Sequence, residues 1–127
     1  MDNAIAVLVV DDDADIRSIV EETLIEGGFA PKIASTGEEA IALLSATKYG
    51  AVVIDISFGR DRVRGWSVAR RARAFNPSLS VIYITGGHAD DWAIEGVPGS
   101  VLLTKPFTPP QLVAAISQLL VSSSSER

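Results

Sequence analysis

The sequence predicts a doubly wound α/β fold in which helices cover both faces of a five-stranded parallel sheet. Short β-branched apolar runs alternate along the chain with segments of helix length, which is the pattern of repeated βα units. Most of these runs are almost continuously apolar, as expected of strands that are buried on both faces. A length of 127 residues suits one domain with a substantial core.

Five strands and five helices account for most of the chain. The predicted strands cover residues 5–10, 30–34, 51–55, 80–84 and 100–103. The predicted helices run from about residue 13 to 27, 36 to 46, 66 to 75, 88 to 96, and from 109 onward.

Capping residues, glycine and proline set the helix boundaries. Gly27 and Gly28 end the first helix, because glycine tolerates the left-handed conformation found at helix ends. Overlapping Ser/Thr–Glu capping boxes within residues 35–39 begin the second helix, and only one need be used. The third helix ends before Asn76-Pro77, since the residue preceding a proline is pushed out of helical geometry.

The last two helices differ in how clearly the sequence marks them. The fourth is short and is followed by Gly96-Val97-Pro98-Gly99, so we expect it to be brief or mobile. Thr108 caps the fifth, with Pro109 in the first helical position and Gln111 completing a capping box. We expect one domain over residues 1–121 and a disordered tail over 122–127.

Composition and charge limit the classes of function. The longest apolar runs, such as residues 4–10, fall far short of the ~20 residues that a membrane-spanning helix needs. The first residues lack the basic region and apolar stretch of a secretory signal, and the chain has no cysteine. We therefore expect a soluble cytoplasmic protein that does not bind membranes. The formal net charge of −5 at pH 7 argues against direct binding to nucleic acid.

Reactive polar side chains stand where the predicted strands end. Asp11 and Asp12 follow the first strand, Asp55 ends the third, and Thr85 and Lys105 follow the fourth and fifth. In an open parallel sheet, ligands bind outside the carboxyl ends of the strands. If the strand order is 2-1-3-4-5, the first and third strands are neighbours, and Asp11 and Asp12 lie beside Asp55.

Three carboxylates at one edge repel one another unless a cation neutralises them. An all-oxygen ligand set favours a hard ion and predicts Mg²⁺. Lys105 adds a second positive group, and the Asp55 carboxylate can act as a covalent nucleophile toward phosphorus. The transition state of phosphoryl transfer spreads negative charge over three oxygens, which the metal, Lys105 and the Thr85 hydroxyl can stabilise. The residues therefore indicate Mg²⁺-dependent phosphoryl transfer.

Four ordered motifs resemble the signatures of response-regulator receiver domains of two-component systems. The resemblance spans nearly the whole chain and implies a flavodoxin-like (βα)5 sandwich with strand order 2-1-3-4-5. The motifs are Val9-Val10-Asp11-Asp12-Asp13, Val53-Ile54-Asp55, Ile84-Thr85-Gly86 and Lys105-Pro106-Phe107.

The resemblance also implies a role for each residue of the site. Asp55 would accept the phosphoryl group and would ligate Mg²⁺ together with Asp11, Asp12 and the backbone carbonyl of Ser57. Thr85 and Lys105 would contact the phosphoryl oxygens, and the peptide bond before Pro106 would be cis.

Partners follow from the same resemblance. The phosphoryl donor would be a phosphohistidine on a sensor histidine kinase or a histidine phosphotransfer protein. The output would be altered binding to a downstream protein target, and a weak homodimer is compatible with this reading. The chain would be a signalling phosphoacceptor, not an enzyme in the ordinary sense, and would catalyse only its own phosphorylation and dephosphorylation.

One departure from the receiver pattern lies between Asp55 and Gly65. This stretch is about two residues longer than usual and lacks the usual proline. We expect a long loop in which Arg60, Asp61 and Arg62 alter the access of the phosphodonor or of hydrolytic water.

A second departure is Leu102, three residues before Lys105, where many receivers carry a switching aromatic residue. We expect phosphorylation to change the conformation of the glycine-rich region around Gly86, Gly87 and Gly96 instead, because glycine backbones change conformation at little free-energy cost.

Several conspicuous residues have a plainer interpretation. His88, the only histidine, is expected to be a surface residue, and Trp66 and Trp92 to be packing or rim aromatics. Six of the eleven basic residues fall within residues 60–73, and such a cluster is usually a solvated helix face, although partner docking remains open.

Three other functions fit the sequence less well. An aspartate-dependent phosphohydrolase carries two aspartates flanking one residue, whereas Ile56 and Ser57 follow Asp55. A non-phosphorylated pseudo-receiver would keep the fold as an interaction module, and the intact set of candidate site residues weighs against it. A dinucleotide- or flavin-binding protein needs glycines or hydroxyls after the first strand, where this chain has carboxylates.

Overall fold

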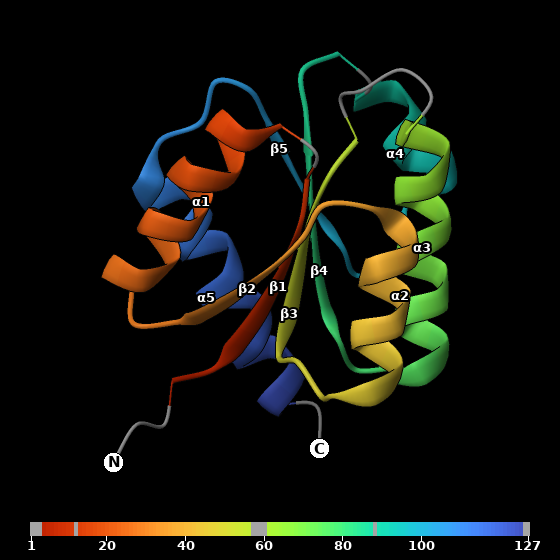
Figure 1. Ribbon diagram of the computed structural model, residues 1–127, viewed down its shortest axis with the longest axis horizontal. Coiled ribbons are helices and arrows are strands. Elements are labelled where there is room, and N and C mark those ends of the chain that lie inside the picture. The colour runs from red at the N-terminus through yellow and green to blue at the C-terminus, as the bar shows by residue number, and fades with distance from the viewer. Residues whose placement is uncertain (1–3, 12, 57–60, 88, 126–127) are drawn as a thin grey trace.

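Five parallel strands form the middle layer of the molecule, and helices cover both of its faces (Figure 1). The computed structural model describes residues 4–11, 13–56, 61–87 and 89–125. One face carries α1 (Ala14–Glu26) and α5 (Pro109–Ser125). The other face carries α2 (Gly37–Ala46), α3 (Asp61–Phe75) and α4 (Ala89–Glu95).

The strand order is β2-β1-β3-β4-β5, which confirms the predicted topology. Every neighbouring pair is parallel, so all five strands end at the same edge of the sheet. The predicted strand boundaries differ from the observed ones by at most one residue. The strands are β1 Ala6–Val10, β2 Ala30–Ala34, β3 Ala51–Asp55, β4 Ser80–Thr85 and β5 Val101–Thr104.

Strand residues alternate between two cores, one on each face of the sheet. Leu8, Ile54 and Tyr83 belong to the core beneath α2 and α3. Val9 and Ile82 belong to the core beneath α1 and α5. Because the central strands are buried on both faces, their backbone is rigid at the edge where the polar side chains begin.

Side-chain caps begin the helices that follow the strand ends. Asp13 Oδ1 accepts the Asp15 N–H at 2.9 Å at the start of α1. In α5, Thr108 Oγ1 accepts the Gln111 N–H at 3.4 Å and Gln111 Oε1 accepts the Thr108 N–H at 2.7 Å, so the predicted capping box is confirmed. These caps fix where the chain turns away from the sheet edge.

The α2 start uses one of the two overlapping capping boxes in part. Thr36 Oγ1 accepts the Glu39 N–H at 3.1 Å, as one box requires. The Glu39 carboxylate accepts the N–H of Ser35 at 2.9 Å, one residue before the cap.

The third helix begins five residues earlier than predicted, at Asp61. Gly65 was interpreted as the end of a loop, but the structure places it inside α3, where it lets the helix approach β3 closely. A Cβ atom at Gly65 would lie 2.5 Å from Ile56 Cγ2. Residues 61–65 of the expected long loop therefore belong to α3, and residues 57–60, with Arg60 among them, lie outside the described residues.

The last helix is longer than predicted, since α5 continues through Ser125. The tail expected from residue 122 is corrected accordingly, and residues 126–127 lie outside the described part of the chain. A serine costs a helix only a few tenths of a kcal/mol relative to alanine, so a run of serines does not by itself end one. Among the described residues, no helix combines the length and the apolar character needed to cross a membrane.

We predict that Gly65→Ala destabilises the protein by about 1–2 kcal/mol, measured by urea unfolding. The new methyl group collides with a branched side chain of the core, which outweighs the ~1 kcal/mol gained from helix propensity. The matched control is Gly87→Ala, where a Cβ meets nothing within 4 Å. The control should change the free energy of unfolding by less than about 0.5 kcal/mol. A stabilised Gly65→Ala variant would contradict the close approach.

Candidate functional site

The carboxyl edge of the sheet brings together four of the predicted site residues. Asp11 follows β1, Asp55 ends β3, Thr85 ends β4 and Lys105 follows β5. Asp11 is 4% exposed, Asp55 7% and Thr85 0%. Polar groups are rarely buried this deeply without partners, so their arrangement is specific.

Asp55 and Lys105 form an ion pair at this edge. Lys105 Nζ lies 2.7 Å from Asp55 Oδ2. The Lys105 backbone is itself anchored, because its N–H donates to the carbonyl of Thr85 at 2.8 Å. The Lys105–Pro106 peptide bond is cis, which confirms the expectation drawn from the receiver resemblance.

Asp11 lies against Asp55, and this environment disfavours the charged form of the Asp11 carboxyl group. Burial, with the charge and hydrogen bond of Asp55, raises the pKa of Asp11 from 3.8 to about 7. The Asp13 N–H, which donates to Asp11 Oδ1 at 2.8 Å, and the charge of Lys105 lower the pKa by less. One lysine therefore does not fully offset two adjacent carboxylates.

Thr85 occupies the next strand along the edge. Ile84, the residue before it on β4, is the register partner of Asp55, which puts Thr85 one residue beyond the level of the Asp55 carboxylate. Its side chain is buried, and its hydroxyl accepts the N–H of Gly87 at 3.2 Å. Thr85 thus contacts Lys105 through its backbone carbonyl and the segment that leads to α4 through its hydroxyl.

The donor set fits a hard divalent cation. Two buried carboxylates in contact, opposed by one ammonium group, leave excess negative charge among oxygen ligands, which is the environment that Mg²⁺ favours. The predicted ligands Asp12 and Ser57 lie outside the described residues. Within the described part of the chain, no three acidic, histidine or cysteine side chains gather around one centre.

Some of the residues singled out in the sequence lie together at this edge of the sheet, and others do not. Asp55 contacts both Lys105 and Asp11, and Thr85 adjoins them through the Lys105 backbone. His88 lies outside the described residues. Trp66 is buried against Tyr83, with ring centroids 4.7 Å apart, and belongs to the core.

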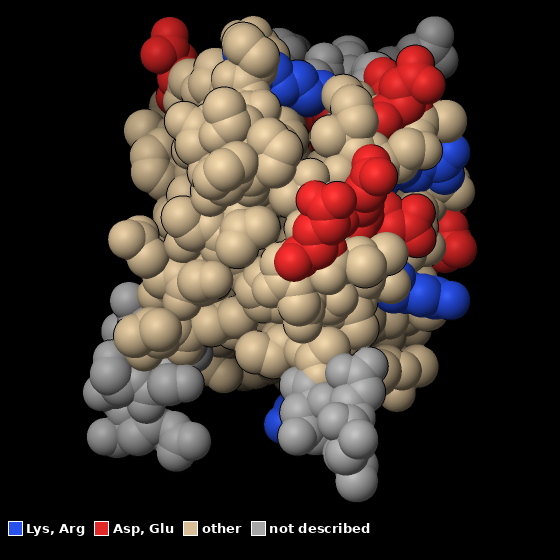
Figure 2. All heavy atoms as spheres, turned by 90° about the vertical axis from the view of Figure 1, so that its left-hand side faces the viewer, with Lys and Arg blue, Asp and Glu red and all other residues tan. Residues whose placement is uncertain are grey.

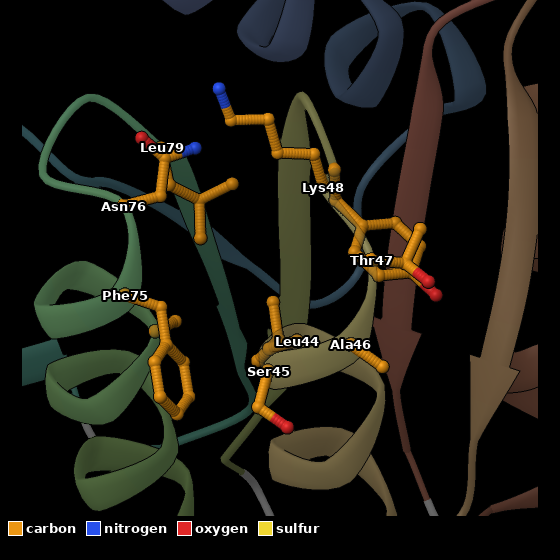
Figure 3. Close-up of a pocket in the computed structure, with 10 residues that line it drawn as sticks. Leu44, Ser45, Ala46, Thr47, Lys48, Phe75, Asn76 and Leu79 are labelled. Carbon is orange, nitrogen blue, oxygen red and sulfur yellow. The ribbon is translucent and has the colours of Figure 1, made fainter.

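A hollow lies at the opposite edge of the sheet, between the ends of α2 and α3 (Figure 3). Its volume is about 300 Å³, and Leu44 and Phe75 line its two sides. Lys48 is the charged residue among the described residues that line it. Without a carboxylate in that lining, this hollow does not offer the chemistry that the sequence indicates.

Sequence reasoning missed the tyrosine that organises the neighbourhood of α4. Tyr83 Oη accepts the N–H of Val97 at 3.2 Å, which joins the middle of β4 to the turn before β5. Nothing in a run of apolar residues marks one tyrosine as a hydrogen-bond partner of a residue fourteen positions away.

Comparisons with known proteins agree on one family. The family model described as the response regulator receiver domain matches residues 7–117. The chain resembles the response regulator receiver protein of Sinorhizobium medicae WSM419, with 42% identity, a TM-score of 0.88 and coverage of 95% of this chain and 98% of that one. It also shares the fold of a CheY-like receiver domain from Methanospirillum hungatei JF-1, at 22% identity and a TM-score of 0.84, over 98% of this chain and 100% of that one.

Curated relatives are longer than this chain. The C4-dicarboxylate transport transcriptional regulatory protein DctD of Rhizobium meliloti (strain 1021) is 33% identical over 116 residues, which is 89% of this chain and 25% of the relative. The response regulator MprA of Mycolicibacterium vanbaalenii is 29% identical over 118 residues, 91% of this chain and 50% of the relative. The chain thus spans between a quarter and a half of the length of these proteins.

We predict that Asp11→Asn stabilises the protein without divalent cations at about pH 8, by roughly 3–8 °C in Tm. The raised pKa means that the folded state holds a proton which the unfolded state releases near pH 4. Asp11 therefore contributes less to stability as pH rises from about 4 to about 7, and above that range its charge is a constant cost.

The difference in Tm between Asp11→Asn and wild type should shrink toward about pH 4, where Asp11 is protonated in both states. Thermal unfolding followed by circular dichroism in EDTA measures it. Glu22→Gln, which removes an exposed carboxylate from α1, is the control and should show little pH-dependent gain. A destabilised Asp11→Asn variant at high pH would contradict the crowding of the carboxylates.

Proposed function

The chain belongs to the response-regulator receiver family of two-component systems, and we propose that it takes a phosphoryl group onto Asp55 with the help of Mg²⁺. Receiver domains are signalling modules and not enzymes in the ordinary sense. The observation that carries the proposal is the ion pair between the buried Asp55 and the partly exposed Lys105, with Asp11 in contact with Asp55. Two buried carboxylates beside each other are costly to build, and phosphoryl transfer gives them a use.

The reaction exchanges one bond to phosphorus for another. A carboxylate oxygen of Asp55 attacks the phosphorus of a phosphohistidine, and an O–P bond forms as the P–N bond breaks. The imidazole leaves with the electron pair of that bond and takes up a proton from solvent. Asp55 then carries an acyl phosphate, which water later hydrolyses.

Lys105 and Thr85 are the residues that would receive the phosphoryl oxygens. The Lys105 ammonium lies 2.7 Å from Asp55 Oδ2, so it is already placed beside the carboxylate that would bear the group. Thr85 supplies a hydroxyl from the neighbouring strand. Both can stabilise negative charge as it spreads over the transferring oxygens.

Asp11 and Asp55, together with Asp12 and the carbonyl of Ser57, would hold Mg²⁺. The bound cation would supply positive charge that neutralises the phosphoryl oxygens and the carboxylates around them. The raised pKa of Asp11 supports this assignment, because a carboxylate that resists ionisation alone is one that a cation would relieve.

The partners follow from the chemistry of the group transferred. We infer a sensor histidine kinase or a histidine phosphotransfer protein as donor, a downstream protein as target, and a cytoplasmic location without direct nucleic-acid binding. Figure 2 shows the face of α1 and α5, where acidic side chains gather. On α1 the exposed carboxylates include Glu21, Glu22 and Glu26, whereas α5 carries no charged residue. A protein that docks on α1 would meet these carboxylates with basic groups.

A pseudo-receiver that keeps the fold without phosphorylation has no support. A protein that is never phosphorylated would not need a lysine beside this aspartate. This chain keeps the two groups in contact, with Lys105 Nζ 2.7 Å from Asp55 Oδ2. The family match extends over residues 7–117 and includes the ends of all five strands.

We predict that incubation with Mg²⁺ and acetyl phosphate adds one phosphoryl group to the wild-type protein, detected by intact-protein mass spectrometry. Asp55→Asn should abolish the addition, because an amide nitrogen or oxygen there forms no acyl phosphate. Asp90→Asn, which removes an exposed carboxylate near the start of α4, should leave it intact. Equal labelling of wild type and Asp55→Asn would reject Asp55 as the acceptor.

We also predict that Lys105→Gln slows this phosphorylation about 100-fold, since one preorganised positive group at the transferring oxygens is lost. The time course of the same mass increase measures the rate. Lys48→Gln is the matched control, because Lys48 is an exposed lysine at the opposite edge of the sheet. A Lys105→Gln rate within about twofold of wild type would exclude a role for the ammonium group.

A further inference from the structure

The hollow between the ends of α2 and α3 has the size and the walls of a site for a small molecule (Figure 3). Its volume is about 300 Å³, at the lower end of the range found for ligand sites. Phe75 and Leu44 stand on its two sides, so an apolar group fits between the helix ends. The whole of β3 lies between this hollow and Asp55, which makes it separate from the candidate phosphorylation site.

A tyrosine whose hydroxyl has no partner lines this hollow. Tyr49 is 8% exposed, and none of the described residues forms a hydrogen bond with its hydroxyl. The other tyrosine, Tyr83, follows the common rule for buried tyrosines, because its hydroxyl accepts the Val97 N–H. Burial raises the pKa of Tyr49, so its hydroxyl stays protonated at neutral pH and can donate to an oxygen atom of a ligand.

Positive charge gathers at the hollow, although the protein as a whole has a formal net charge of −5. Residues 44–49 and 72–79 supply its lining, and neither segment contains Asp or Glu. Lys48 is part of the lining. Arg71 lies over the Phe75 ring, with its guanidinium carbon 5.8 Å from the ring centroid, so a second cation stands beside one wall of the hollow.

The two helix ends offset only part of this positive charge. A helix C-terminus carries about half a negative elementary charge, so the ends of α2 and α3 together balance about one cation. Arg73 also lies on α3, but its guanidinium already donates to the carbonyls of Leu79 and Pro98. Lys48 and Arg71 then leave a surplus of about one positive charge, which a ligand with a single negative charge would balance.

We propose that the hollow binds a small monocarboxylate with an aromatic or branched apolar body. The apolar body lies between Leu44 and Phe75. Lys48 pairs with the carboxylate, and the Tyr49 hydroxyl donates to one of its oxygens. Such a ligand contacts the ends of both α2 and α3, so its binding stabilises the packing of these two helices. None of these residues takes part in the proposed phosphoryl transfer, so either proposal can fail without the other.

Three small probes separate the contributions of the charge and of the apolar body. Phenylacetate carries both, phenylacetamide keeps the ring without the charge, and acetate keeps the charge without the ring. Each probe is titrated into the full chain and followed in ¹H–¹⁵N spectra. Phenylacetate should shift the amides of Ser45, Lys48 and Asn76 with a dissociation constant of about 1 mM or below, and the other two probes should bind at least about tenfold more weakly.

Two conservative variants test the polar contacts. Lys48→Gln should weaken the binding of phenylacetate about tenfold and leave that of phenylacetamide within about twofold of wild type, a difference that a loss of structure would not produce. Tyr49→Phe, which removes only the hydroxyl, should weaken phenylacetate about fivefold. Lys32→Gln is the matched control, because Lys32 is an exposed lysine on β2 outside the lining, and this variant should bind phenylacetate as wild type does.

Lys48 is exposed, so Lys48→Gln keeps the test decisive if Tyr49→Phe does not fold. Saturable binding of phenylacetate that requires both its charge and Lys48 supports the proposal. Equal affinity for phenylacetate and phenylacetamide, or amide shifts that rise without saturating, would overturn it. Shifts centred on Asp55 and Lys105 in place of the hollow would overturn it as well.

Discussion

The contact of two buried carboxylates with one lysine at the carboxyl edge of the sheet is the constraint on which the rest of the structure depends. Asp55 is paired with Lys105, and Asp11 lies against Asp55 with its pKa raised to about 7 by burial and by that neighbour. The fold tolerates this cost because rigid strands buried on both faces position the groups. The same excess of negative charge is the basis on which we propose a cation site and a reaction at phosphorus at this edge.

Most of the candidate site at this edge could be predicted from the sequence. In a parallel sheet of known strand order, residues at the ends of neighbouring strands lie side by side. Asp11 and Asp55 follow apolar runs whose ends are hard to mistake, and the order 2-1-3-4-5 places those runs side by side. Thr85 ends β4 and Lys105 follows β5, and the same argument predicts both of them. Aspartates at strand ends are common, so the evidence lay in the shared order of the four motifs and not in any single residue.

Features that depend on side-chain packing across the sequence were not predictable. Gly65 suggested a helix boundary, yet it lies inside α3 because β3 passes too close for a side chain. The bond from Tyr83 to Val97 joins a strand to a distant turn, and no local pattern marks it. Such contacts depend on side chains that are far apart in the sequence, whereas the strand ends place the candidate site residues directly.

The most direct test of the central claim is the effect of millimolar Mg²⁺ on the Tm of wild type and of Asp11→Asn at about pH 8. A cation that binds only the folded state raises its stability, and the rise depends on the carboxylates that hold it. We expect Mg²⁺ to raise the Tm of wild type clearly and the Tm of Asp11→Asn much less. An equal response of the two proteins, or none from wild type, would contradict the claim that these carboxylates form a divalent-cation site.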